Sequence, residues 1–139
     1  MAHFGLNRAD NEEALPFQEA ARREMQGMVQ IGGFAAIYLF THEGLLLASQ
    51  VANSSMLRED HAVEFAVLMA KFKKVIKKMS GLSPLKELVL EDGDGRRLVF
   101  RYLTLFGQTA LLLIVVPAQR SYRGLANRLC RLIEAQAAQ

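Results

Sequence analysis

The sequence has few of the features that would mark a secreted or membrane protein. It contains one cysteine, Cys130, so it has no internal disulfide and no zinc site built from cysteines, as in a reducing compartment. No apolar run approaches the roughly 20 residues that span a bilayer, and the first residues lack the apolar core of a signal peptide. We therefore expect a cytoplasmic protein without a transmembrane segment, in which Cys130 is a plain core residue.

An excess of charge of one sign is also missing. The chain has 17 Lys and Arg against 14 Asp and Glu, and a net charge of +3 is too small to imply nucleic acid as a partner. There is no internal repeat or low-complexity stretch, and 139 residues correspond to one domain with its own core. We expect an N-terminal tail over residues 1–15 and a single domain over 16–139.

Catalytic and ligand-binding motifs are scarce as well. His3, His42 and His61 are scattered and have no HxxxH spacing or cysteine partner, so they are interpreted as surface residues. Asp92 and Asp94 stand in a glycine-rich stretch that lacks the other ligands of a calcium loop, which favours a hairpin turn. The serines have no nucleophile-elbow motif around them. These absences predict a protein that is not an enzyme and holds no cofactor or metal.

The stretch from Gly32 to Ser49, GGFAAIYLFTHEGLLLAS, predicts a β-hairpin at the centre of the fold. Residues 34–41 are almost wholly apolar and rich in aromatic and branched side chains, which is typical of a strand buried on both faces. Gly44 can turn the chain back through a positive φ, and residues 45–49 resume the apolar run. The glycine pair that opens the stretch ends a preceding helix.

The rest of the chain reads as helices and strands around this hairpin. Apolar residues at spacings of three and four predict helices, and apolar or alternating runs between turn signals predict strands. The expected order is α-β-β-α-β-β-β-α, an α+β fold with an antiparallel sheet. The expected helices cover residues 16–31, 60–80 and 121–136, and the strands after the hairpin cover residues 85–91, 97–103 and 109–116.

The second helix is apolar on two sides. At 100° per residue, one stripe is predicted to pack on the sheet: Phe65, Leu68, Met69, Phe72, Val75, Ile76 and Met79. A second stripe of smaller residues covers the other side of the first half: Ala62, Val63, Ala66, Val67 and Ala70. A helix that is apolar all round is expected to be buried all round, which favours a partner on the second stripe. The alternative is a contact with the loop at 51–59.

The second half of the same helix carries the lysine cluster KFKKVIKK at 71–78. The interpretation that needs no partner is a solvated helix end, where lysines also suit the negative end of the helix dipole. The alternative is a surface for an acidic partner or anionic lipid. The candidate partner surface consists of Lys71, Lys74, Lys77 and Lys78.

The hairpin stretch and the element order resemble the roadblock/dynein light-chain family. The signature of that family is a helix leading into a GG-x-A-like strand, an acidic or histidine-containing turn with Gly-Leu, and a strand that ends in Ala-Ser. The resemblance covers about residues 17–136. The matching positions are Gly33, Ala35, Glu43, Gly44, Leu45, Ala48 and Ser49.

This resemblance implies a fold, a partner and an assembly. Similar domains have a five-stranded antiparallel sheet in the order 2-1-5-4-3, with the first and last helices on one face and the second on the other. They form homodimers or paralogous heterodimers by joining third strands and packing second helices, and they serve as scaffolds or regulators of small Ras-like GTPases, as do bacterial members similar to gliding-motility protein B. Applied here, the resemblance implies a dimer interface of Ala62, Val63, Ala66, Val67, Ala70, Leu88 and Leu90.

A second hypothesis comes from another functional class. A sheet covered by helices can enclose a pocket, as in profilin-like or sensor-type domains that bind small ligands. Such a site needs polar side chains that converge inside an apolar pocket. The only candidates in the sequence are Tyr38 and His42.

Overall fold

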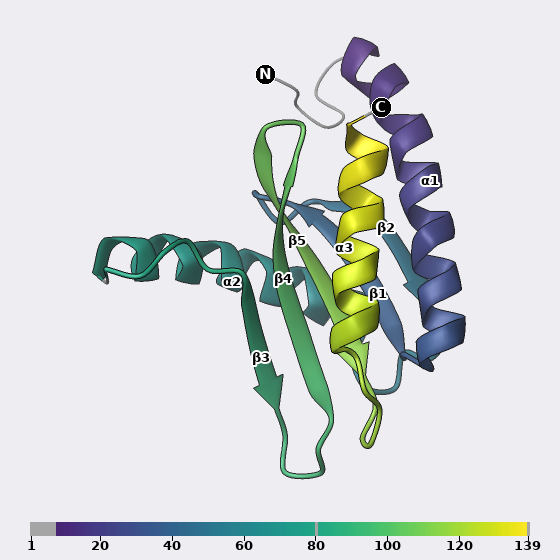
Figure 1. Ribbon diagram of the computed structural model, residues 1–139, viewed down its shortest axis with the longest axis vertical. Helices are drawn as coiled ribbons and strands as arrows, with labels where there is room; N and C mark the ends of the chain where they lie inside the picture. Colours follow the sequence, from purple (N-terminus) through teal and green to yellow (C-terminus); the bar gives the residue numbers. More distant parts are fainter. Residues whose placement is uncertain (1–7, 80, 139) are drawn as a thin grey trace.

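The computed structural model describes residues 8–79 and 81–138, with side chains from residue 16 onward. It confirms the expected α-β-β-α-β-β-β-α order and the antiparallel sheet, whose strands lie in the order β2-β1-β5-β4-β3 (Figure 1). The elements are α1 (Arg8–Gly32), β1 (Ala36–Thr41), β2 (Leu46–Val51), α2 (Glu59–Met79), β3 (Glu87–Glu91), β4 (Arg97–Leu105), β5 (Gln108–Val116) and α3 (Arg123–Ala137).

The two most apolar strands form the middle of the sheet. β1 is buried along its whole length, and so is β5 from Ala110 onward. They pair antiparallel, with Ile37 opposite Ile114 and Leu39 opposite Leu112. Strands covered on both faces need apolar side chains at every position rather than at alternate ones, as the sequence predicts.

The turn of the central hairpin is fixed by Thr41 and Gly44. The Thr41 amide donates to the Leu45 carbonyl at 2.8 Å, and the Leu45 amide donates to Thr41 Oγ1 at 3.1 Å. Gly44 has a φ of +88°, and a Cβ atom there would lie 2.7 Å from Cγ2 of Val67 on α2. Glycine is therefore required twice, by the backbone conformation and by the close approach of α2.

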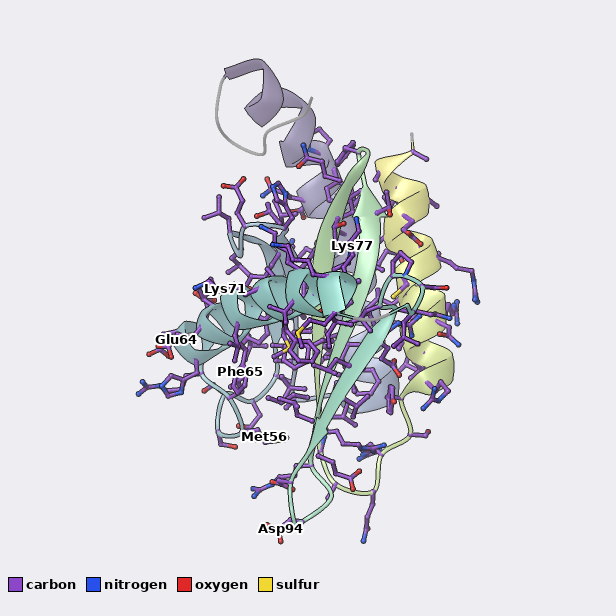
Figure 2. The ribbon with its side chains drawn as sticks, turned by 90° about the vertical axis from the view of Figure 1, so that its left-hand side faces the viewer. Met56, Glu64, Phe65, Lys71, Lys77 and Asp94 are labelled. Atoms are coloured by element: carbon purple, nitrogen blue, oxygen red, sulfur yellow. The ribbon has the colours of Figure 1, made fainter. Side chains whose placement is uncertain are left out.

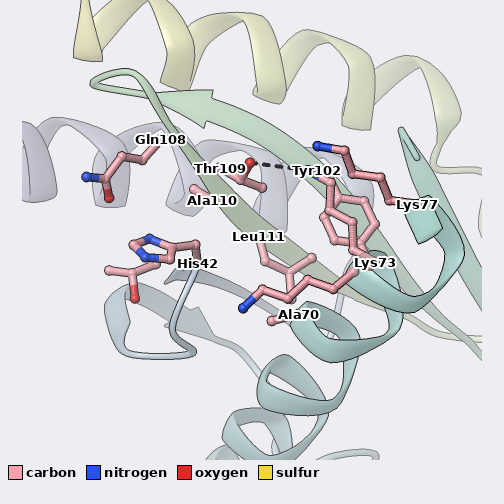
Figure 3. A pocket seen from close by; sticks show the side chains of 11 residues that line it. His42, Ala70, Lys73, Lys77, Tyr102, Gln108, Thr109, Ala110 and Leu111 are labelled. Carbon is pink, nitrogen blue, oxygen red and sulfur yellow. Dashed lines mark hydrogen bonds between the residues drawn. The ribbon is translucent and has the colours of Figure 1, made fainter. Parts of the chain in front are cut away.

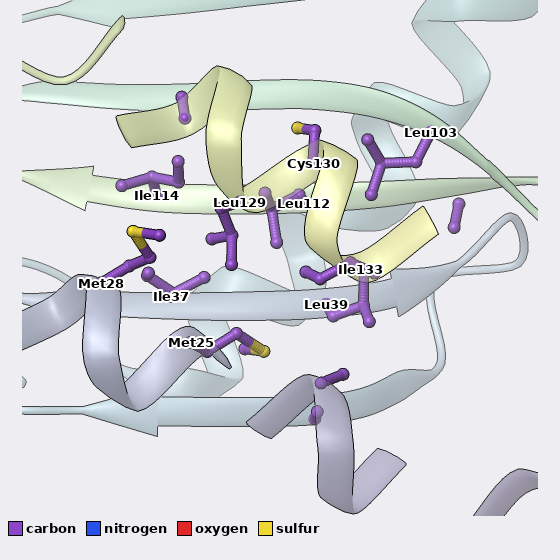
Figure 4. Packing of buried hydrophobic residues seen from close by; sticks show 14 of the residues in the cluster. Met25, Met28, Ile37, Leu39, Leu103, Leu112, Ile114, Leu129, Cys130 and Ile133 are labelled. Atoms are coloured by element: carbon purple, nitrogen blue, oxygen red, sulfur yellow. The ribbon is translucent and has the colours of Figure 1, made fainter. Parts of the chain in front are cut away.

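Helices α1 and α3 pack side by side on one face of the sheet (Figure 1). Their inward side chains interleave with alternate residues of the strands, as Figure 4 shows for Met25, Leu129, Ile37 and Leu112. All four side chains have no exposed surface. This layer forms the larger of the two cores, and Cys130 lies within it, as expected.

Helix α1 begins earlier than predicted. Pro16 was expected at the first helical position, but the helix starts at Arg8 and Pro16 lies inside it. The segment 8–15 contains mainly residues that are tolerated in helices, so the helix continues past a proline that lacks one backbone donor. The domain boundary at residue 16 stays a prediction, and His3 lies outside the described residues.

One buried charge ties β3 and β4 to α3. Arg101 is only 5% exposed; its Nη1 donates to Asn127 Oδ1 at 2.8 Å and lies 3.5 Å from Glu87 Oε1. Glu87 also accepts a hydrogen bond from the Tyr122 hydroxyl at 3.4 Å and lies 3.7 Å from Arg123. Because a buried guanidinium without a carboxylate is costly, this network holds the edge strand against the sheet.

A candidate interaction surface and cavity on helix α2

Helix α2 crosses the other face of the sheet, and its C-terminal end projects beyond β3 (Figure 1). Its buried residues are Ala62, Ala66 and Met69. The sheet offers large side chains to this helix, and the ring of Phe65 lies 6.0 Å from that of Phe100. Small residues on the helix thus pack over large residues on the sheet, which fills the space between them.

The sheet-facing stripe predicted for α2 is therefore correct only in part: it includes Met69 and Phe65, which pack on the sheet, but not Ala62 and Ala66. Of the stripe expected on the sheet, only Met69 is buried, while Phe65 and Ile76 are half-buried. The remaining four are exposed: Leu68 (54%), Phe72 (38%), Val75 (47%) and Met79 (78%). Both stripes fit the helical period. The stripe with small side chains faces the sheet, because aromatic rings of the strands already fill the space beneath the helix.

These four side chains form a continuous apolar stripe, which we call the outer stripe. They stand at positions i, i+4, i+7 and i+11, so they follow one line along the solvent side of α2. Isolated apolar residues on a surface are ordinary, whereas a contiguous row of this kind marks an interaction site.

The seven residues assigned to a dimer interface are divided by the structure. Ala62 and Ala66 are fully buried within the single chain and have no surface left for a partner. Val63, Ala70 and Leu88 are half-buried, and Val67 and Leu90 are exposed. A second copy that packs on α2 would therefore not contact Ala62 and Ala66.

Strand β3 ends the sheet, on the side where the C-terminal end of α2 projects (Figure 1). It pairs only with β4, so within the part of the chain that the structure describes its other side has no strand partner. Val89 and Leu90 are exposed on it. A groove of about 350 Å³ near Leu90 is lined by Met56 and Phe65, which lie between α2 and the turn that carries Asp94 (Figure 2). An open edge strand beside apolar side chains is suited to pairing with another chain.

The opposite edge of the sheet is covered. At β2 the register shifts beside Leu39, and the Gln18 side chain of α1 donates to the Leu47 carbonyl at 2.9 Å. A bulge and a helix that contacts the edge both prevent strand addition. The two edges of this sheet are therefore not equivalent.

The lysines of α2 do not form one surface. Lys74 and Lys77 line a cavity between the helix and the sheet, whereas Lys71 lines a separate groove with Leu68, and Lys78 lines neither. The cavity includes Lys73, which sequence reasoning left out. Lys73 continues the spacing of Ala62, Ala66 and Met69, so a correct choice of the buried stripe would have identified it.

The cavity has a volume of about 370 Å³ and is walled by α2 on one side and by the ends of β1, β4 and β5 on the other. Figure 3 shows His42 and Gln108 on one side of it and Lys73, Lys77 and Tyr102 on the other. Its remaining lining residues are Thr41, Ala70, Lys74, Thr109, Ala110 and Leu111.

Lys73 is held in place at the wall of this cavity. Its ammonium donates to Thr109 Oγ1 at 3.2 Å and lies 5.2 Å from the centre of the Tyr102 ring. The Tyr102 hydroxyl in turn donates to the Met69 carbonyl at 3.0 Å, which fixes the ring. Burial lowers the pKa of Lys73, and the charge of Lys77 lowers it further.

The other polar candidates do not assemble into a catalytic or metal site. Tyr38 is fully buried and does not line the cavity, and burial raises its pKa. Asp92 Oδ1 accepts hydrogen bonds from the amides of Asp94 and Arg96 at 2.9 Å each, which fits the predicted hairpin turn. Among the residues that the structure describes, no three His, Cys, Asp or Glu side chains are grouped to hold a metal ion.

Over residues 8–79 and 81–138, no helix combines the length and the apolar character needed to cross a membrane.

The fold has counterparts among solved structures. The gliding protein MglB of Thermus thermophilus is 16% identical, with a TM-score of 0.73 over 88% of this chain and 91% of that chain. MglB of Myxococcus xanthus is 13% identical, with a TM-score of 0.61 over 86% and 85%, and the Roadblock/LC7 domain from Streptomyces avermitilis is 17% identical, with a TM-score of 0.60 over 82% and 92%. No family model and no curated protein matches the sequence. The chain has the roadblock fold, as its resemblance to that family implied.

Proposed function

We propose that this chain is a non-catalytic scaffold that self-associates through α2 and β3 and regulates a small Ras-like GTPase in the cytoplasm. The observation that carries the proposal is the outer stripe of α2 together with the open edge of β3. Four large apolar side chains in one line are unfavourable in water, and a second copy of the same surface would bury them.

The edge strand extends the same interface. Two copies related by a two-fold axis could pair their β3 strands antiparallel and continue the sheet from one chain into the other. Leu90 would then be covered together with Leu68 and Phe72 of α2, because it lies on the α2 side of the sheet, where it lines a groove with Phe65. This revises the interface implied by the resemblance, since it leaves Ala62 and Ala66 inside each chain.

The GTPase part of the proposal depends on the family resemblance. The hairpin signature at 32–49 and the roadblock fold support it, and one structural neighbour is described as MglB with a tetrameric arrangement (16% identity, TM-score 0.67). In this chain the paired α2 helices would form the platform. A scaffold of this kind needs no catalytic residues of its own.

Self-association is tested by placing a charge on the outer stripe. Leu68→Glu should raise the dimer dissociation constant by at least about tenfold, because association would bury an unpaired carboxylate. Ile31→Glu is the matched control, since Ile31 is an exposed apolar residue on α1, away from the outer stripe. Light scattering coupled to size-exclusion chromatography measures the mass. A native chain that is monomeric at micromolar concentration would contradict the proposal.

Regulation of a GTPase is tested separately. The purified chain is mixed with the Ras-like GTPases encoded by the same genome, each loaded with GDP or with a non-hydrolysable GTP analogue. We expect binding that depends on the nucleotide, is weakened by Leu68→Glu and is unchanged by Ile31→Glu. If the chain is dimeric but binds none of these GTPases in either state, the scaffold assignment fails while the dimer stands.

A further inference from the structure

We propose that the cavity between α2 and the sheet binds a small organic carboxylate with an apolar body. The carboxylate would lie between the ammonium groups of Lys73 and Lys77, and the apolar part would lie over Leu111 and beside Ala70. The proposal goes beyond the scaffold function and does not depend on it.

The shape of the cavity suits a small molecule. About 370 Å³ lies within the range of ligand pockets, and most of its lining consists of carbon. It exists because α2 is close to the sheet at Ala66 and Met69 but carries long lysines one turn later, where β4 and β5 continue towards their own turn. Helix and sheet therefore separate at this end and leave an apolar floor under basic walls.

The positive charge of the cavity lining is not balanced by acidic side chains of the lining itself. Lys73, Lys74 and Lys77 line the cavity, and no acidic side chain among the described residues does. His42, which also lines the cavity, has its Nε2 3.7 Å from Glu43 Oε1. The Lys73 ammonium is partly removed from water, and it contacts the neutral Thr109 hydroxyl and the Tyr102 ring. The lowered pKa of Lys73 agrees with a positive site that an anion would stabilise.

We assign a carboxylate because a singly charged, planar head group is compatible with a lining that is mostly apolar. The Lys73 and Lys77 ammonium groups and the Thr109 hydroxyl can donate to its two oxygens, and Lys74 adds a third positive charge. A membrane surface is a poorer match, because a flat membrane would need the lysines of α2 on one face. Lys73, Lys74 and Lys77 instead surround a concavity, and Lys71 and Lys78 do not line it. The cavity lysines and Ala70 also lie on the side of α2 opposite the outer stripe, so ligand and second copy would not compete.

The first test compares head groups on one apolar chain. Octanoate, octyl phosphate, octylamine and octanol are titrated into the native chain by calorimetry, and amide chemical shifts locate the site. We expect octanoate to bind at least about tenfold more tightly than octylamine or octanol, with shifts at Gln108, Thr109 and Leu111. Equal binding of octylamine would reduce the site to an apolar cleft, and tighter binding of octyl phosphate would overturn the carboxylate assignment.

The second test uses variants with equal net charge. Lys73→Gln should lower the affinity for octanoate about tenfold or more, whereas Lys78→Gln on the same helix should leave the affinity unchanged. Ala70→Leu should also weaken octanoate by filling the cavity, without removing a charge. Thermal melting checks that each variant is folded. Equal losses for Lys73→Gln and Lys78→Gln would show attraction to net charge only, and binding to anionic vesicles without octanoate binding would point to a membrane instead. Either outcome overturns the proposal.

Discussion

The two faces of the sheet are built differently. On one face, α1 and α3 bury large side chains such as Met25, Phe17 and Leu129 against the strands, and the layer is closed within the chain. On the other face, a single helix buries two alanines and one methionine and leaves five apolar side chains exposed, namely Val67 and the four of the outer stripe. The first face is fully covered within a single chain. The second face exposes apolar side chains of the kind that normally lie in a protein core.

The edges of the sheet repeat this contrast. β2 carries a bulge and a hydrogen bond from Gln18 of α1, while β3 is open and exposes Val89 and Leu90. Helices α1 and α3 cover the closed face, and α1 also contacts the closed edge at β2. The open face is that of α2, and the open edge is that of β3. The closed parts stabilise the single chain, and our proposal places association with partners at the open parts.

The largest expected effect compares one leucine from each face. Leu129→Ala should lower the free energy of unfolding by about 2–5 kcal/mol, because it leaves a cavity in a closed core. Leu68→Ala should lower it by less than about 1 kcal/mol in the single chain, since Leu68 is already half in water. Urea unfolding at a protein concentration low enough to dissociate any dimer measures both.

Raising the protein concentration sharpens this comparison. If the outer stripe is an interface, the deficit of Leu68→Ala should grow with concentration, whereas the deficit of Leu129→Ala should not. Equal losses for the two variants at every concentration would mean that the two faces do not differ as described.

An intermediate effect is expected at two glutamates of β3. Glu87→Gln should cost about 1–3 kcal/mol of unfolding free energy, because it removes the carboxylate beside buried Arg101. Glu91→Gln on the same strand should cost no more than about 0.5 kcal/mol, since the Glu91 side chain is 62% exposed and lies as far as 4.0 Å from Arg97. Chemical denaturation in parallel measures the pair, and equal small losses would show that the network does not fasten β3.

The smallest effect is on reactivity rather than stability. Burial raises the pKa of the Cys130 thiol to about 11, so this group stays protonated, and hence unreactive, until the pH rises towards that value. At about pH 8, Ellman's reagent should label Cys130 at least about a hundredfold more slowly than an Ile31→Cys thiol in a Cys130→Ala background, since Ile31 is exposed and lies away from the outer stripe. Both thiols should react alike in concentrated guanidinium chloride. Fast labelling of Cys130 in the folded chain would show that the closed face opens.

Helix α2 marks the limit of what could be predicted from the sequence. The Gly44 turn and the apolar strands were predictable, because backbone geometry and burial on both faces impose local rules. The choice between the stripes of Ala66 and Leu68 was not, since both fit a period of 3.6 residues. The same error hid Lys73, which looked like one more solvent-exposed lysine until Ala66 and Met69 were found against the sheet.

The sequence by itself determined the order of the elements, the central hairpin and the existence of a helix that is apolar on two sides. Only the tertiary structure decided which side of that helix the sheet accepts, because the answer depends on the aromatic side chains that the strands bring beneath it from distant positions. Periodicity gives the angle between two stripes but not the rotation of the helix. That rotation places the alanines inside, the outer stripe in solvent and three lysines around a cavity.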